Sequence, residues 1–223
     1  MTVAKEMHTY IDIHTHKISN ASSLEIINVF AGEKAPVNHD GFFSSAIHPW
    51  HVDDDYEEKL KQLKNCVADT KCIAIGETGL DKVCKADFKM QIEVFKEHIK
   101  LSEKYEKPLI LHCVKAYNEI LNIRTELKAR QTWIFHGFNG SYELAERCIE
   151  NSCMLSYGQL LLYDDTKAAK VFPHIAIENV FFETDDEVID ISDVYARAAK
   201  IKGIEVDKLI VAIKNNFLKI FDV

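Results

Sequence analysis

The chain has 223 residues, of which 47% are hydrophobic and 28% are charged, a composition typical of a soluble globular protein. That length suits one domain with a sizeable core, so we expect a single domain over residues 1–223. The formal net charge of −8 argues against a protein that coats nucleic acid through a broad basic surface, although it allows a local basic cleft.

Cysteine usage and hydropathy indicate the compartment. The six cysteines include no Cys-x-x-Cys pair, which favours a protein with reduced, free thiols. The N-terminal segment lacks the basic and apolar regions of a signal peptide, and no apolar run reaches the length of about 18 residues that a membrane span needs. We therefore expect a cytoplasmic protein with no membrane partner, and the sequence indicates no obligate protein partner.

Short apolar runs alternate with amphipathic stretches along the chain. The runs predict strands at residues 10–13, 24–30, 42–47, 72–76, 109–112, 132–135, 154–157 and 180–183. The stretches predict helices at residues 53–69, 86–106, 115–130, 141–151, 165–174, 191–202 and 205–220. Helix caps are expected at the acidic residues 53–55, at Ser141 and at Gly203. The alternation predicts an α/β chain with a largely parallel sheet.

Residues of metal-ligand type stand at the ends of these strands. His14 and His16 close the first strand, and alternate residues of a strand point to the same face. In a barrel the carboxyl ends of all strands meet at one mouth, whereas distant strands of an open sheet cannot converge. We therefore expect an irregular (β/α)8 TIM-type barrel, irregular because the first two connections are too short for full helices. The later strands contribute Glu77, His112, His136 and Asp185.

Each of these six residues has an ordinary structural alternative when it is taken alone. A histidine at a strand end can be a packed core residue, and a carboxylate there can cap a turn or a helix. Their shared position at strand ends favours a metal centre instead. Four histidines and two carboxylates exceed the needs of one tetrahedral zinc ion and suit two divalent ions with a bridging carboxylate. Such ions could be Zn, Mn, Mg, Fe or Ni, and their chemistry favours hydrolysis.

The motifs around these residues carry a family resemblance. They follow one another as IDIHTH (11–16), IGETGLD (75–81), His112, FHGFNGS (135–141) and ETD (183–185), with AIHP (46–49) and NFLKIF (216–221) in addition. This set resembles the TatD family of metal-dependent deoxyribonucleases, within the amidohydrolase superfamily. The match spans nearly the whole chain, and the Gly-Glu-Thr-Gly-Leu-Asp stretch is its most specific part.

The resemblance implies a ligand set and a reaction. One ion would be held by His14, His16 and Asp185 and the other by His112 and His136, with Glu77 bridging. Asp185 would also handle the proton of the attacking water, so Asp185 and Glu77 are the expected catalytic residues. The family's irregular (β/α)8 barrel agrees with the fold expected here. Its best-known activity, hydrolysis of DNA from the 3′ end, makes DNA or a small phosphoester the expected substrate.

The substrate-handling parts depart from the family pattern. Family members usually carry an arginine two residues after the histidine of the fifth strand, where this chain has Val114 and then Lys115. Asp186 and Glu187 replace the small residue and proline that commonly follow Asp185, and their charge opposes an anionic substrate. The candidate substrate contacts are Lys115 and His48, although His48 can also be a packed histidine.

Two other function classes remain open. A metal-dependent enzyme of the wider superfamily could hydrolyse an amide, a lactone or another carbonyl substrate, but the His-x-Gly-Glu segment of its deaminases is absent at residues 112–115. A non-catalytic protein could use the same metal barrel to bind a partner.

Overall fold

The computed structural model describes residues 9–18, 23–33, 41–221 and 223. Its strands are ordered β1 to β8, with parallel pairing and with helices between most of them, which confirms the expected irregular (β/α)8 TIM-type barrel class. Residue contacts divide the chain into two compact units. The first unit comprises Met1–Ile27 and His136–Ile220, and the second comprises Asn28–Phe135 and Phe221–Val223. The expected single domain over residues 1–223 stays a prediction.

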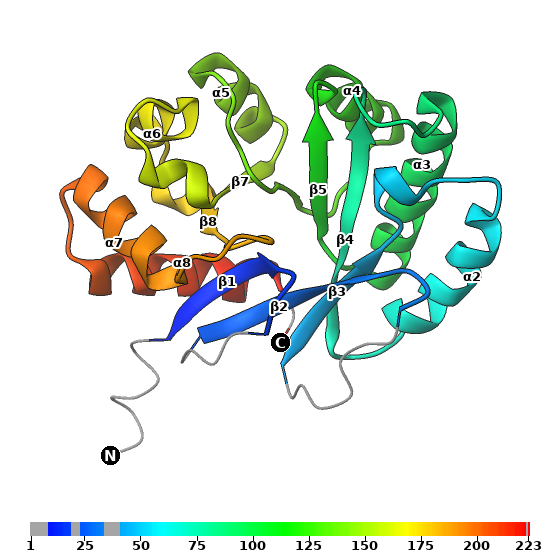
Figure 1. Ribbon diagram of the computed structural model, residues 1–223, viewed down its shortest axis with the longest axis horizontal. Helices are drawn as coiled ribbons and strands as arrows, with labels where there is room; N and C mark the ends of the chain where they lie inside the picture. The colour runs from blue at the N-terminus through cyan, green and yellow to red at the C-terminus, as the bar shows by residue number, and fades with distance from the viewer. Residues whose placement is uncertain (1–8, 19–22, 34–40, 222) are drawn as a thin grey trace. The chain divides into compact units, whose positions relative to one another are not determined.

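The first unit is organised around β1 and β8. β1 pairs in parallel with the start of β2, β7 pairs in parallel with β8, and Thr15 forms a bridge with Asp185. Helices α7 and α8 pack against β1 and β8, as their orange and red ribbons show (Figure 1). Its elements are β1 (Tyr10–Thr15), β2 (Ser23–Phe30, shared with the second unit), α5 (Tyr142–Glu150), β7 (Cys153–Tyr157), α6 (Lys167–Val171), β8 (Val180–Phe182), α7 (Ile191–Lys202), α8 (Val206–Ile220) and short 3-10 turns.

The second unit is organised around β4. This strand pairs in parallel with β3 on one side and β5 on the other, and β5 pairs with β6. Helices α2 and α3 pack against β4, and α2 also contacts β3 (Figure 1). Its elements are β3 (Phe42–Ala46), the 3-10 helix η1 (Pro49–His51), α2 (Tyr56–Val67), β4 (Cys72–Asp81), α3 (Phe88–Tyr105), β5 (Leu109–Val114), α4 (Tyr117–Leu127) and β6 (Trp133–Phe135).

Strand β4 is longer than predicted. The prediction ended it at Gly76, before Glu77, but the strand runs to Asp81, with a shift of register against β5 between Ile75 and Thr78. The glycines permit this because they allow β5 to come close: a Cβ on Gly76 would lie 2.6 Å from the Cβ of Ile110. Glu77 therefore lies inside β4, at its irregularity, and a cis peptide bond joins it to Gly76.

The structure confirms some of the predicted helix caps and not others. Ser141 caps α5 by accepting from the amide of Leu144, and Gly203 ends α7 with a φ of +65°. In contrast, Asp55 precedes α2 and makes no capping hydrogen bond with its side chain. The helix predicted over residues 165–174 is shorter, since α6 gives way to a 3-10 turn at Phe172–His174 that contains Pro173.

Among the described residues, no helix combines the length and the apolar character that crossing a membrane requires. No disulfide joins any of the six cysteines, all of which lie in the described part of the chain.

Candidate metal centres

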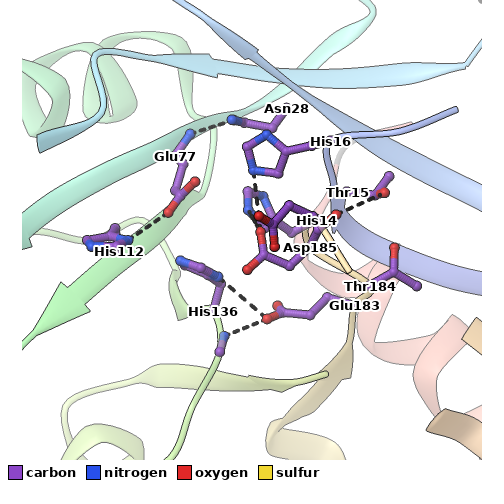
Figure 2. A network of polar contacts seen from close by, with 12 residues as sticks. His14, Thr15, His16, Asn28, Glu77, His112, His136, Glu183, Thr184 and Asp185 are labelled. Atoms are coloured by element: carbon purple, nitrogen blue, oxygen red, sulfur yellow. Dashed lines mark hydrogen bonds and ion pairs between the residues drawn. The ribbon is translucent and has the colours of Figure 1, made fainter. Parts of the chain in front are cut away.

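The first cluster lies where β1 and β8 end, and it consists of His14, His16 and Asp185 (Figure 2). The main chain fixes it: the amide of Asp185 donates to the carbonyl of His14 (2.9 Å), and the amide of His16 donates to the carbonyl of Asp185 (3.0 Å). The Nε2 atoms of His14 and His16 each lie 3.4 Å from Oδ1 of Asp185. Neighbouring strand ends thus bring two imidazoles to one carboxylate.

The charge state of this cluster suits a cation. Burial by itself raises the pKa of Asp185, but the His14 and His16 rings beside it outweigh burial and hold that pKa well below its usual range. The carboxylate is therefore ionised at neutral pH. One donor atom from each of the three residues lies within 4.8 Å of the others. Two nitrogens and one anionic oxygen form a donor set that fits a divalent transition metal.

His136 belongs to the same unit and lies beside His14, with 4.6 Å between the ring centroids. The buried carboxylate of Glu183 supports it: Oε1 accepts from the amide of Gly137 (2.5 Å) and lies 3.5 Å from Nδ1 of His136 (Figure 2). A carboxylate in this place orients an imidazole ring, as in many metal sites. Glu183 is part of the ETD motif, but the sequence pattern predicts no role for it.

Asp12 ties β1 to β8 behind the ligands. Its Oδ2 accepts from the hydroxyl of Thr184 (2.6 Å), and its Oδ1 accepts from the amides of Thr184 (3.2 Å) and His14 (3.3 Å). Burial raises the pKa of Asp12 to about 7. Asp12 and Thr184 each lie within a family motif, but the sequence pattern predicts no role for either.

The second cluster lies in the second unit and consists of His48, Glu77 and His112. Oε1 of Glu77 lies 2.8 Å from Nδ1 of His112 and 3.1 Å from Nε2 of His48. The amide of Glu77 donates to Oδ1 of Asn28 (2.8 Å), which fixes the backbone at the irregularity of β4 (Figure 2). One carboxylate thus lies between two imidazoles.

His48 orients Glu77. Its Nδ1 accepts from the amide of Trp50 (3.1 Å), and burial lowers its pKa below the usual range, so the neutral ring carries its proton on Nε2 and donates it to Glu77. Both ring nitrogens are therefore engaged within the protein. The expected contact between His48 and substrate stays a prediction.

Asp81 is a further buried carboxylate in this unit, 4% exposed. Its Oδ2 lies 3.3 Å from Nε2 of His112 and accepts from the indole Nε1 of Trp50 (2.7 Å). Burial raises its pKa, but the hydrogen bond from Trp50, supported by backbone amides and by His112, holds that pKa below its usual range. Asp81 is the last residue of the IGETGLD motif (75–81), and its place in this motif is the sequence feature that could have identified it.

Of the two candidate substrate contacts, Lys115 is exposed and His48 is buried. Lys115 directly follows β5 and has a φ of +55°. Lys17 donates from Nζ to the main-chain oxygen of Asp186, which ties the segment after β8 to the end of β1. The side chains of Asp186 and Glu187 are exposed. The structure assigns Lys115 no contact with the candidate centres, and its role stays a prediction.

The structure therefore brings the predicted ligands together in two groups. His14, His16, His136 and Asp185 lie together in the first unit, and Glu77 and His112 lie together in the second unit with His48. A shared ion for His112 and His136, and a bridging role for Glu77, both join residues of different units and stay predictions.

Sequence comparisons agree with the family motifs. The family described as "TatD related DNase" matches residues 31–222. An uncharacterized metal-dependent hydrolase of Buchnera aphidicola is 27% identical over 201 residues, which cover 83% of this chain and 76% of the relative. The uncharacterized metal-dependent hydrolase YabD of Bacillus subtilis is 34% identical over 141 residues, which cover 62% of this chain and 55% of YabD.

Solved structures agree with the fold. The crystal structure of YjjV, a TatD homologue from Escherichia coli, matches with a TM-score of 0.85 at 22% identity, covering 97% of this chain and 99% of that one. A TatD-family hydrolase from Entamoeba histolytica matches with a TM-score of 0.76 at 15% identity, covering 96% and 98% of the two chains.

Proposed function

The chain belongs to the TatD family of metal-dependent hydrolases, and we propose that it hydrolyses phosphodiester bonds in DNA, working from the 3′ end of a strand. The alternative substrate within this proposal is a small phosphoester. The observation that carries the proposal is the convergence of His14 and His16 on one ionised carboxylate oxygen of Asp185.

We assign the ligands by their donor atoms. His14, His16 and Asp185 would hold one divalent ion, and His112, His136 and Glu77 would complete the site for a second. When bound, such ions would lower the pKa of a water molecule, polarise the phosphoryl group and neutralise charge on the leaving oxygen. The nitrogen-rich donor set accepts Zn, Mn, Fe or Ni more readily than Mg.

The protein's own residues would then manage the proton and the geometry. A carboxylate oxygen of Asp185 would accept the proton of the water that attacks phosphorus, the P–O bond to the leaving oxygen would break, and the proton would pass to that oxygen. Glu183 keeps the His136 ring oriented through Nδ1, and Asp12 keeps β1 and β8 together through Thr184. His48 donates to Glu77, which limits the orientations that the Glu77 carboxylate can take.

Elemental analysis combined with a chelation assay tests the proposal. The protein is stripped with a chelator and supplied in turn with Mn²⁺, Mg²⁺ or Zn²⁺, using 3′-labelled single-stranded DNA as substrate. We expect loss of cleavage with chelator and recovery with at least one ion, and no recovery in His14→Ala.

Two results would contradict the proposal and indicate a different function. Turnover confined to lactones or cyclic amides in a parallel substrate panel would assign the metal centre to carbonyl chemistry. Full metal occupancy without hydrolysis of any substrate in the panel would indicate a binding protein.

A further inference from the structure

Trp50 is a large aromatic side chain that the proposed metal chemistry does not use. It lies in η1 and is 61% exposed. Its Nε1 donates to Oδ2 of the buried Asp81 at 2.7 Å. The edge of the indole is therefore fixed to the protein while much of the side chain faces solvent, which is how a stacking platform is prepared in advance.

An open cavity of about 440 Å³ adjoins the indole, and we call it the Trp50 pocket. It is lined by Trp50, Asp81, Val83, Cys84 and Lys85. Val83 is 62% exposed, so a second apolar side chain faces solvent beside the ring. The pocket thus presents apolar surface that the described fold leaves uncovered.

The wall of the pocket is held rigidly. Oδ1 of Asp81 accepts from the amides of Val83 (2.7 Å) and Cys84 (3.2 Å). Below it, the buried side chain of Gln91 accepts from the amide of Asp81 (2.8 Å) and donates to the main-chain oxygen of Ala86 (3.0 Å). Because these bonds fix the segment after β4, a ligand would enter a pocket that is already formed.

The charge of the pocket suits a phosphate-bearing ligand. The negative charge of Asp81 is directed at the donors of Trp50, Val83, Cys84 and the His112 ring, and not at the opening. Lys85 lines the pocket with an exposed side chain, and no described carboxylate lies within ion-pairing distance of it. A cation thus stands beside a flat apolar surface.

Two residues that line the pocket, Asp81 and Trp50, also contact His112 of the second cluster. The same Oδ2 of Asp81 that holds Trp50 lies 3.3 Å from Nε2 of His112. The rings of Trp50 and His112 lie 5.8 Å apart between centroids. A group stacked on Trp50 would therefore lie one side chain away from a proposed metal ligand.

We propose that the Trp50 pocket binds one unpaired nucleobase of the nucleic-acid substrate, stacked on the indole, with Lys85 beside a backbone phosphate. The inference rests on the proposed phosphodiester activity and specifies its substrate as a single-stranded end, because a paired and stacked base has no free face to offer. Every base has such a face, so the pocket would accept all four.

Intrinsic fluorescence offers a direct test, because the chain has two tryptophans and Trp133 is fully buried. Metal-free protein is titrated with an oligothymidylate and with an oligonucleotide of equal length that carries abasic units. We expect saturable quenching by the oligothymidylate, little by the abasic strand, and none in Trp50→Phe, where only Trp133 emits. Fluorescence anisotropy should show that Trp50→Ala binds oligothymidylate about tenfold more weakly.

The matched control is Tyr163→Ala, which removes another aromatic side chain, 55% exposed, from the first unit. It should bind the oligothymidylate as the unaltered protein does. Absence of quenching, equal quenching by the abasic strand, or unchanged affinity in Trp50→Ala would each overturn the nucleobase site. Since these measurements need neither metal nor turnover, they are independent of the cleavage assay, whose failure in the unaltered protein would instead reject the proposed function.

Discussion

In the first unit, His14, His16 and Asp185 are fixed by main-chain hydrogen bonds between β1 and β8, whereas in the second unit Glu77 and His112 are fixed by their own side chains. The distances between the imidazole nitrogens and the carboxylate oxygen differ accordingly. In the first cluster the imidazole nitrogens lie 3.4 Å from the carboxylate oxygen, but in the second cluster these distances are 2.8 and 3.1 Å. An ion entering the second cluster must therefore displace hydrogen bonds that already satisfy its carboxylate.

The largest expected effect is the loss of catalysis from the first cluster. Asp185→Asn removes the proposed proton acceptor and one anionic donor, so we expect kcat to fall by about 100- to 10,000-fold. Cleavage of 3′-labelled single-stranded DNA, with circular dichroism to confirm folding, measures it. Glu77→Gln is the matched change in the second unit and should also abolish most turnover. Near-normal kcat in either folded variant would contradict the assigned roles.

A buried histidine makes the second unit sensitive to acid. His98 accepts from the amide of Ile47 (3.0 Å) through Nε2 and contacts the carbonyl of Val94 (2.7 Å) through Nδ1. Burial lowers its pKa from 6.5 to about 4, so the folded state excludes a proton that the unfolded state binds. The contribution of His98 to stability should therefore be complete above pH 6.5 and fall by about 3 kcal/mol as the pH drops toward 4.

Urea unfolding at several pH values measures this dependence. His98→Gln should be less stable at neutral pH but should lose less of its remaining stability between pH 6.5 and 4. Parallel pH curves for the two proteins would show that another group controls the acid response. In the first unit Asp12 acts in the opposite direction: burial raises its pKa from 3.8 to about 7, so the folded state binds a proton that the unfolded state does not, and this adds stability as the pH falls. The difference between the two pH curves therefore isolates the contribution of His98.

Intermediate effects should come from the supporting carboxylates. Glu183→Gln and Asp81→Asn keep the shape of each side chain but weaken the orientation of His136 and His112, respectively. We expect each to weaken the binding of one Zn²⁺ or Mn²⁺ ion by about 10- to 100-fold. Isothermal titration with metal-stripped protein resolves the two ions if the clusters bind independently. The same loss at both ions in each variant would show that the clusters act as one site.

The smallest effect separates helix capping in the two units. Ser141→Ala should lower the free energy of unfolding by about 1 kcal/mol, because the Ser141 side chain accepts from the amide of Leu144. Asp55→Ala should change it much less, since the Asp55 side chain makes no capping bond. Urea unfolding of both variants measures the two changes in the free energy of unfolding. Equal losses in Ser141→Ala and Asp55→Ala would contradict the predicted difference in capping.

Much of this arrangement could be predicted from periodicity and from residues at strand ends. His14, His16 and Asp185 followed from the expected convergence of neighbouring strand ends, and the ranges of most helices differ from the structure by only a few residues. The course of β4 could not be predicted in this way. Glycines such as Gly76 and Gly79 usually mark the end of a strand. Only the close approach of β5 to these glycines shows that the strand continues through them.

The supporting residues were missed for a different reason. Asp12, Asp81 and Glu183 are buried carboxylates, and their partners are distant in sequence or lie on other elements. A local sequence pattern shows that a carboxylate is present, but it does not show which group forms a hydrogen bond or ion pair with it. The spacing within each motif therefore predicted candidate ligands and left out the carboxylates that orient them.

The bond between Asp12 and Thr184 joins residues that are 172 positions apart. As the chain is synthesised, β1 must wait for β8 before its histidines have a carboxylate partner, whereas His48, Glu77 and His112 are all present once β5 has been made. A chain interrupted before Thr184 would thus contain His48, Glu77 and His112 of the second cluster but would lack Asp185 of the first. Because the first cluster joins residues from both ends of this long interval, a product truncated before Asp185 would lack the proposed proton acceptor.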